Sequence, residues 1–219
     1  MLRSRSVKRR MVTSVHNRQN ESLNLLAHAY LSFGQPEIIV GNLISDFVKG
    51  KKQFDYPRGI QRGITLHRNI DTFTDSSDAT RVAKEVFRPA YRLYSGAITD
   101  IIYDHFLARD ENEFPEGSLL SFSQEVYAVL EKYHSWLPPQ FAGMFPYMKS
   151  QNWLYNYKSK GGIEKSLRGL VRRSAFLTES DSAFVLFELH YDLLQASYEQ
   201  LIIEIKSYAK QRLQELLAS

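Results

Sequence analysis

The stretch Ile98–Ala108 reads ITDIIYDHFLA, and it decides the fold class. Apolar residues occupy nearly every face of a helix drawn through this stretch, except the face that carries Asp100 and Asp104. This pattern predicts a helix that is buried on almost all sides. Because such a helix must be surrounded by other elements, we expect it to lie inside a bundle.

The flanking sequence predicts further helices. Apolar residues recur at helical spacing from about Leu23 onward. Pro36 suits the first turn of a second helix, and Gly50 suits its C-terminal cap. Further helices are expected at about 57–73, 77–87, 98–108 and 120–136. Another is expected to follow Gly161-Gly162 and to run through Leu170, and one long helix is expected over 181–217. No segment alternates as a strand would, so we expect residues 23–219 to form a single-domain, all-α helical bundle.

The basic character of the chain belongs to residues 1–22. This segment carries six basic side chains against Glu21, which leaves 22 basic and 23 acidic side chains in the remainder. We expect residues 1–22 to be a basic, disordered extension without a catalytic role. A nucleic-acid arm and a targeting peptide are alternative interpretations of the segment.

Several classes of protein are disfavoured by what the sequence lacks. It contains no cysteine, which excludes disulfides and thiolate metal sites and fits a cytoplasmic location. No apolar run approaches the roughly 18 residues that a membrane span requires. No Gly-x-Ser-x-Gly motif and no phosphate-binding glycine loop occurs. The oligomeric state cannot be inferred from the sequence.

Histidine and aspartate recur at spacings that suit metal binding. His67 and Asp71 are four residues apart, so on a helix both would lie on one face. Asp100 and Asp104 have the same spacing, and His105 adjoins the second of them. Two ionised carboxylates in an apolar setting repel each other, and a cation removes that penalty. Imidazole and carboxylate ligands suit Mn²⁺, Fe²⁺ or Zn²⁺.

Each of these residues also has a structural interpretation. His67 and Asp71 could form a solvent-facing helical pair. Asp46, beside Leu43 and Phe47, is either a ligand or a surface residue near a helix end. His28, among apolar residues, is either a ligand or a hydrogen-bonded histidine of the core.

Four blocks of sequence together resemble the acyl carrier protein phosphodiesterase family. They are Asn24–His28, Gly41-Asn42 with Ser45-Asp46-Phe47, His67-Arg68-x-Ile70-Asp71 with Thr74-Asp75, and Asp104–Leu107. The order and spacing of the blocks match, and the resemblance extends from about Leu23 to near the C-terminus. Family members tend to begin near the first block, which supports treating residues 1–22 as an addition.

The resemblance implies an all-α fold akin to the HD-type metal-dependent phosphohydrolases, with Mn²⁺ as the usual ion and Mg²⁺ or Fe²⁺ as alternatives. It implies hydrolysis of 4′-phosphopantetheine from the serine of holo-acyl carrier protein. The polar residues implied to line the metal centre are His28, Asp46, His67, Asp71 and Asp104, with His105 either binding metal or orienting a ligand. HD-type proteins are named for consecutive His-Asp, whereas this chain has Asp104-His105.

The mechanistic hypothesis assigns three residues to the reaction. Asp46 or Asp71 would orient or deprotonate the attacking water, and Arg68 would hold a phosphoryl oxygen. Because carrier proteins are acidic, a local basic patch is expected for docking, formed by Lys49, Lys51, Lys52, Arg58 and Arg62. The competing hypotheses are an HD-type nucleotide phosphohydrolase and a non-enzymatic helical binding module that uses its basic tail on nucleic acid.

Overall fold

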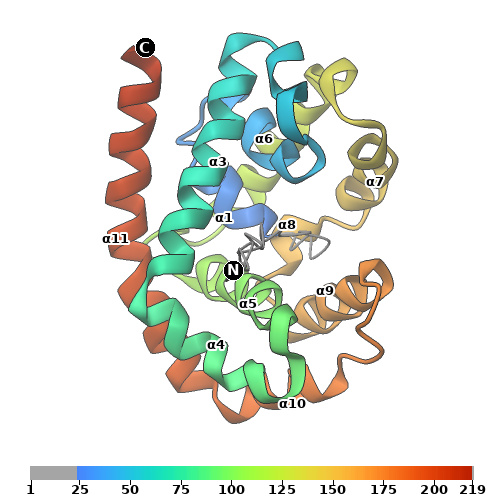
Figure 1. Ribbon diagram of the computed structural model, residues 1–219, viewed down its shortest axis with the longest axis vertical. Coiled ribbons are helices and arrows are strands. Elements are labelled where there is room, and N and C mark those ends of the chain that lie inside the picture. Colours follow the sequence, from blue (N-terminus) through green and yellow to red (C-terminus); the bar gives the residue numbers. More distant parts are fainter. Residues whose placement is uncertain (1–23, 219) are drawn as a thin grey trace, which may run out of the picture.

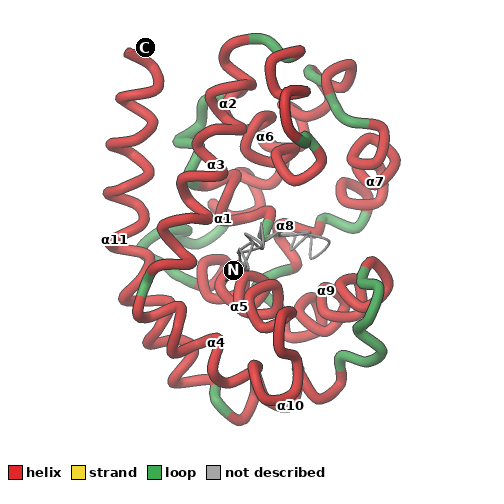
Figure 2. Tube along the Cα trace, viewed as in Figure 1, coloured by secondary structure: helices red, strands yellow, loops and turns green. Residues whose placement is uncertain are grey.

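This computed structural model describes residues 24–218, within which every regular element is a helix (Figures 1 and 2). The predicted all-α class is therefore confirmed, whereas the expectation for residues 1–22 lies outside the described range. The α-helices are α1 (Leu25–Tyr30), α2 (Pro36–Ile44), α3 (Arg58–Ser76), α4 (Asp78–Tyr91), α5 (Ser95–Arg109), α6 (Ser118–Lys132), α7 (Pro139–Ser150), α8 (Trp153–Asn156), α9 (Lys160–Arg173), α10 (Asp181–Leu189) and α11 (Tyr191–Ala218). Short 3₁₀ helices are η1 (Ser45–Phe47), η2 (Gly50–Asp55), η3 (Arg92–Tyr94) and η4 (His134–Trp136).

Helix α5 is the buried helix that the sequence predicts. It contacts α1, α4, α9 and α11, and α11 also runs along α3 and α4 (Figure 1). Ile101 and Ile102 are completely buried, and so are the polar residues Thr99, Asp104 and His105. Buried polar groups require partners, so the partners of Asp104 and His105 decide what these two residues do.

Several predicted helix boundaries are wrong; for example, α6 ends at Lys132 rather than at residue 136, and α4 extends to Tyr91. Helix α2 ends at Ile44 rather than Gly50, because the chain tightens into η1 and Val48 adopts an extended conformation. The long last helix is two helices, since the backbone of His190 leaves the helical region at φ −110° and ψ 24°. The early end of α2 places Asp46 on a 3₁₀ turn rather than on a helix face.

Helices α2 and α3 pack with their backbones in contact at two glycines. A Cβ atom on Gly41 would lie 2.1 Å from the carbonyl oxygen of Ile60, and one on Gly63 would lie 2.5 Å from that of Ile38. Neither backbone oxygen can move without shifting its helix. The glycines therefore set the close approach of α2 and α3, and with it the distance between Asn42 and His67.

Replacing Gly63 with alanine should destabilise the protein by about 1–3 kcal/mol, because the added methyl group separates two packed helices. Gly143→Ala is the matched control, since a Cβ atom at this α7 position meets nothing within 4 Å. The control should be neutral or stabilising by about 0.5–1 kcal/mol. Urea denaturation measures both values, and equal stability of the two variants would contradict the close-contact account.

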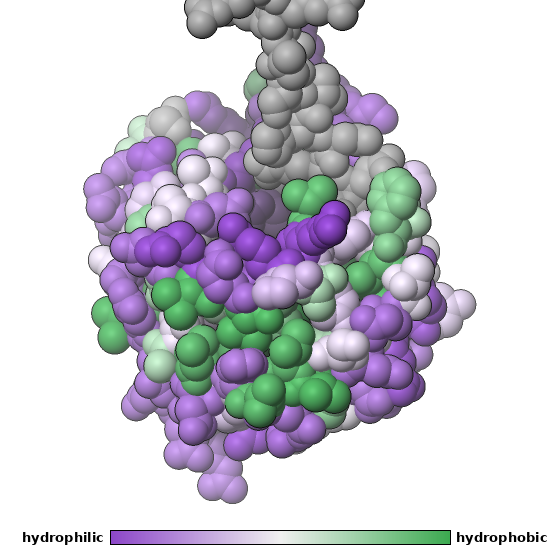
Figure 3. Space-filling view, turned by 60° about the horizontal axis from the view of Figure 1, so that its bottom comes forward, coloured by the Kyte–Doolittle hydropathy of each residue, from purple (hydrophilic) through white to green (hydrophobic). Residues whose placement is uncertain are grey.

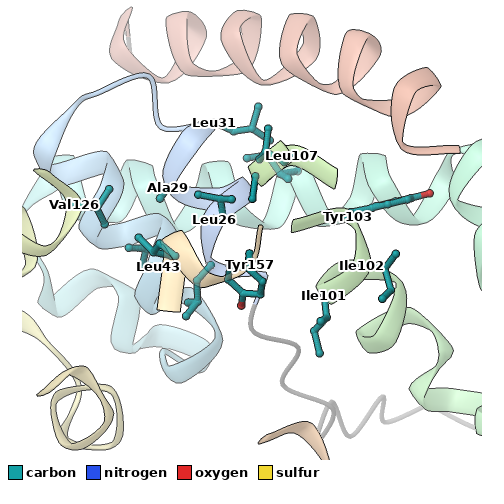
Figure 4. Packing of buried hydrophobic residues seen from close by; sticks show 14 of the residues in the cluster. Leu26, Ala29, Leu31, Leu43, Ile101, Ile102, Tyr103, Leu107, Val126 and Tyr157 are labelled. Carbon is teal, nitrogen blue, oxygen red and sulfur yellow. The ribbon is translucent and has the colours of Figure 1, made fainter. Parts of the chain in front are cut away.

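Helix α1 is held by its surroundings rather than by its own length. It has six residues, which is too short for independent stability. Figure 4 shows Leu26 and Ala29 among buried side chains from α2, α5 and α6, including Leu43, Leu107 and Val126. This packing fixes the helix that carries His28.

The surface has a hydrophobic region away from this packing centre. Figure 3 shows hydrophobic side chains gathered on the face formed by α4, α10 and the start of α11. Val82, Val86, Leu186 and Leu193 line a pocket of about 610 Å³ there. None of the helices between residues 24 and 218 has the combination of length and apolarity needed to cross a membrane.

Candidate metal centre

Three side chains from two helices converge at one point. The ligand atoms of His28 on α1 and of His67 and Asp71 on α3 lie within 4.8 Å of one another. Nε2 of His28 is 3.3 Å from Oδ1 of Asp71, and Nε2 of His67 is 3.2 Å from Oδ2 of the same carboxylate. The four-residue spacing on α3 therefore does place His67 and Asp71 on one face.

Asp46 joins this cluster from η1. Its Oδ1 atom is 3.2 Å from Nε2 of His67. The side chains of Asp46 and Asp71 are 31% and 27% exposed, whereas His28 and His67 are buried. The cluster thus consists of two buried imidazoles and two carboxylates that are partly exposed to solvent. We refer to His28, Asp46, His67 and Asp71 as the His/Asp cluster.

The imidazole rings are held by Asn42 on the side away from the carboxylates. Nδ1 of His28 lies 2.7 Å from the side-chain oxygen of Asn42, and Nδ1 of His67 lies 2.7 Å from its backbone oxygen. Because a carbonyl oxygen only accepts, each neutral ring must donate from Nδ1. The lone pair of each ring is then on Nε2, which faces the carboxylates.

This arrangement fits a divalent cation. Lone pairs of two imidazoles directed at two carboxylates repel each other unless a positive charge lies between them. Nε2 of His28 is buried, and its 3.3 Å contact with Oδ1 of Asp71 is no hydrogen bond in this tautomer, because neither atom carries a proton. A set of imidazole nitrogens and carboxylate oxygens suits Mn²⁺, Fe²⁺ or Zn²⁺. The residues present therefore match the kind of metal that the sequence suggests.

The pKa values of the cluster reflect the same crowding. Burial lowers the pKa of His28, and the neighbouring His67, whose ring stacks on it at 3.9 Å, lowers it further. Burial also disfavours the charged form of His67, but Asp71 and Asp46 outweigh it and raise that pKa to about 10. Burial opposes ionisation of Asp71, yet His67 and His28 hold its pKa below the usual range. In the metal-free protein a proton on His67 thus supplies the missing positive charge.

Asp104 lies away from these ligand atoms and contacts the backbone of α1 instead. Its carboxylate accepts hydrogen bonds from the N–H groups of Leu26 at 3.0 Å and Ala27 at 2.8 Å. Burial raises the pKa of Asp104 well above its usual range, and the two N–H donors oppose that rise. Helix α1 has no side-chain cap of its own from Asn24, so Asp104 satisfies N–H groups that the helix leaves open.

His105 also has other partners than the cluster. Its Nδ1 atom lies 2.7 Å from the backbone oxygen of Tyr157, and its Nε2 atom lies 3.3 Å from the hydroxyl of Tyr191. Both ring nitrogens are therefore engaged. Burial lowers the pKa of His105 to about 4, so the ring is neutral near pH 7.

This buried, neutral ring predicts a pH dependence of stability. Between pH 6.5 and 4 the unfolded chain binds a proton at His105 that the folded chain does not, so the free energy of unfolding should fall as pH falls through this range. The contribution is about 3 kcal/mol, and it is fully present above pH 6.5. His105→Gln removes it, so denaturation at several pH values should show a shallower decline in the variant. An equal decline in both proteins would contradict this role.

Arg68 is next to His67 on α3 and reaches the segment that follows Asp46. Its guanidinium donates to the side-chain oxygen of Gln53 and, at 3.2 Å, to the backbone oxygen of Val48. These two bonds use two of its five N–H donors. Arg68 thus holds the η1–η2 segment against α3, beside the His/Asp cluster.

Asn42 has no role that the sequence pattern predicts, although the residue contacts both histidines. An asparagine in a sequence gives only a weak indication of a metal site. In addition, one of the two contacts that Asn42 makes with the histidines comes from its backbone. Its position was nevertheless informative, because Asn42 is a polar residue in the apolar run Ile38–Ile44 and is completely buried. A buried amide must be hydrogen-bonded, so this position marks a polar network inside the bundle.

Comparison with known proteins agrees with the blocks described above. The family model for acyl carrier protein phosphodiesterase matches residues 23–205. A protein of that name from Enterobacter sp. (strain 638) is 31% identical over 191 residues, which cover 87% of this chain and 99% of the relative. One from Yersinia pestis is 32% identical over 174 residues, or 79% of this chain and 90% of the relative. No solved structure matches the chain, so the likeness to the HD-type fold stays a prediction. The chain belongs to the acyl carrier protein phosphodiesterase family.

Proposed function

We propose that this protein is a metal-dependent phosphodiesterase that acts on holo-acyl carrier protein. It hydrolyses the bond between 4′-phosphopantetheine and the serine of the carrier, which gives apo-carrier protein and free 4′-phosphopantetheine. Family membership supports the substrate, and the His/Asp cluster supports the metal dependence. We place the reaction in the cytoplasm, which a chain without cysteine suits.

The single observation that carries the proposal is the convergence of His28, His67 and Asp71, with Asp46 beside them. We propose that these four residues hold one divalent metal centre with Mn²⁺ as the working ion. When bound, such an ion lowers the pKa of a water and neutralises charge on phosphoryl oxygens.

The remaining chemistry belongs to side chains. Hydrolysis joins a water oxygen to phosphorus and breaks the bond from phosphorus to the serine oxygen, which leaves with the electron pair and takes up a proton. We propose that Asp46 or Asp71 orients the water or accepts its proton, because both carboxylates are partly exposed to solvent. Arg68 would bind a non-bridging phosphoryl oxygen with its remaining N–H donors.

The exposure of the carboxylates favours a substrate that is presented by a protein. Small-molecule sites usually enclose most of the ligand, whereas the carboxylates of Asp46 and Asp71 are partly open to solvent. The adjoining η2 segment exposes Lys51 and Lys52, and the ring of Phe54 is 64% exposed. We propose that η2 forms the core of the docking surface for the acidic carrier, with Lys49, Arg58 and Arg62 around it.

Reversing the charges of Lys51 and Lys52 to glutamate should raise the KM for holo-carrier protein by roughly tenfold and flatten its dependence on salt, because docking loses electrostatic attraction. The value of kcat should change little. The matched control is Lys165→Glu with Lys210→Glu, which reverses two exposed lysines on α9 and α11. Similar KM values for both double variants would remove η2 from the docking surface.

Mass spectrometry of holo-carrier protein after incubation with the enzyme and Mn²⁺ tests the proposed reaction. We expect the carrier to lose the mass of 4′-phosphopantetheine, and chelation of the metal should prevent this loss. A panel of nucleotides in the same assay tests the alternative HD-type phosphohydrolase. Hydrolysis of nucleotides with an intact carrier would overturn the proposal, and so would an absence of any hydrolysis.

A further inference from the structure

We propose that Asn42 is the positioning residue that presents both histidines to the metal, one through its side chain and the other through its backbone. The inference rests on the proposed metal centre and adds to it the group that fixes the two imidazole tautomers. Its geometric basis is the pair of 2.7 Å contacts from Asn42 to Nδ1 of His28 and Nδ1 of His67.

The orientation of the Asn42 amide is fixed by its other partners. Its Nδ2 group donates to the backbone oxygen of His28 at 2.8 Å and to Oγ of Ser32 at 3.0 Å. The Ser32 hydroxyl donates its own proton to the same backbone oxygen at 2.8 Å, so Oγ must act as the acceptor for Nδ2. A flipped amide would set its oxygen against these two acceptors and would lose both bonds. The side-chain oxygen therefore faces His28.

This network explains why the position requires asparagine. The side chain must donate on one side and accept on the other, and it lies in a completely buried site. Leucine has a similar shape but neither function, and aspartate retains only the acceptor. The backbone oxygen of residue 42 remains in every variant, so His67 keeps its partner when the side chain changes. The structure thus separates the two effects within one residue.

The first test needs no substitution at Asn42. Long-range ¹H–¹⁵N NMR of the metal-free full-length chain reports which ring nitrogen of His28 carries the proton, and loss of the signal in His28→Gln identifies it. We expect the proton on Nδ1 near pH 7.5. A proton on Nε2 would overturn the inference, whether or not the protein hydrolyses holo-carrier protein.

The second test is the affinity for Mn²⁺ alone, measured by calorimetry. Asn42→Leu should weaken binding by about 10- to 100-fold, as loss of a ligand-orienting hydrogen bond does in other metal sites. Asn42→Asp keeps the acceptor for His28 but sets its second oxygen against the backbone oxygen of His28, so it should recover only part of that loss. Thr99→Val controls for removal of a buried polar group elsewhere, since the Thr99 hydroxyl donates within its own helix to Ser95, and it should bind Mn²⁺ as the unaltered protein does.

The outcomes separate this inference from the proposed function. Unchanged Mn²⁺ affinity in a folded Asn42→Leu variant would overturn the role of Asn42. An equal loss in Thr99→Val would also overturn it, because the effect would then be one of general packing. If the His28 tautomer and the Mn²⁺ affinities are as expected but holo-carrier protein is not hydrolysed, the role of Asn42 is supported and the substrate assignment is refuted. The tautomer measurement decides the question even if Asn42→Leu does not fold.

Discussion

Replacing Asp71 with asparagine should reduce Mn²⁺ affinity and turnover by at least about 100-fold, more than the loss of a residue that only orients a ligand. Asp71 is the carboxylate that both imidazoles share, at 3.3 Å from His28 and 3.2 Å from His67. Asparagine keeps the shape of the side chain and removes its charge. The affinity loss therefore isolates the contribution of the carboxylate.

Thermal unfolding provides a second measurement for Asp71. A ligand at 100 times its Kd stabilises the folded state by about 2.7 kcal/mol, which corresponds to a rise in Tm of roughly 5–10 °C for a chain of this size. We expect Mn²⁺ to produce this rise in the unaltered protein and a rise of no more than about 2 °C in Asp71→Asn at the same concentration. Asp75→Asn is the matched control, because Asp75 lies one turn further along α3 and pairs with Lys84 at the surface. A Tm rise of equal size in Asp71→Asn would contradict the site.

Replacing Asp104 with alanine should lower the free energy of unfolding by roughly 2–5 kcal/mol, because the buried N–H group of Leu26 and the half-buried N–H group of Ala27 lose their acceptor. The Asp104→Asn variant keeps one acceptor oxygen for one of the two donors, so it should lose less stability than the alanine variant. Urea denaturation gives both values.

The response to Mn²⁺ separates the two possible roles of Asp104. If Asp104 supports α1, folded Asp104→Asn should bind Mn²⁺ within about tenfold of the unaltered protein, while Asp71→Asn does not. If Asp104 were a ligand, removal of its buried charge would preserve or raise stability and abolish Mn²⁺ binding. The second result would contradict the placement of Asp104 on the backbone of α1.

The sequence predicts the fold class well because the relevant signal is local. Helix α5 is apolar on nearly all faces, and no tertiary information is needed to recognise it as buried. Helix ends are less predictable. The end of α2 at Ile44 and the break at His190 depend on how neighbouring segments pack, and the residues at those positions carry no strong stop signal.

The candidate site was only partly predictable for a related reason. A four-residue spacing places His67 and Asp71 on one face, but the same spacing at Asp100 and Asp104 carries no metal-site geometry in the described chain. Spacing on one helix cannot say what lies opposite that face. His28 approaches α3 only because α1 is packed in place, and Asp104 approaches the backbone of α1 for the same reason.

The most direct test of the metal centre is anomalous X-ray diffraction from crystals of the full-length protein soaked in Mn²⁺. We expect a manganese peak within coordination distance of Nε2 of His28, Nε2 of His67 and the carboxylate of Asp71. A peak beside Asp104 and His105 instead, or no peak at saturating Mn²⁺, would contradict the proposed centre.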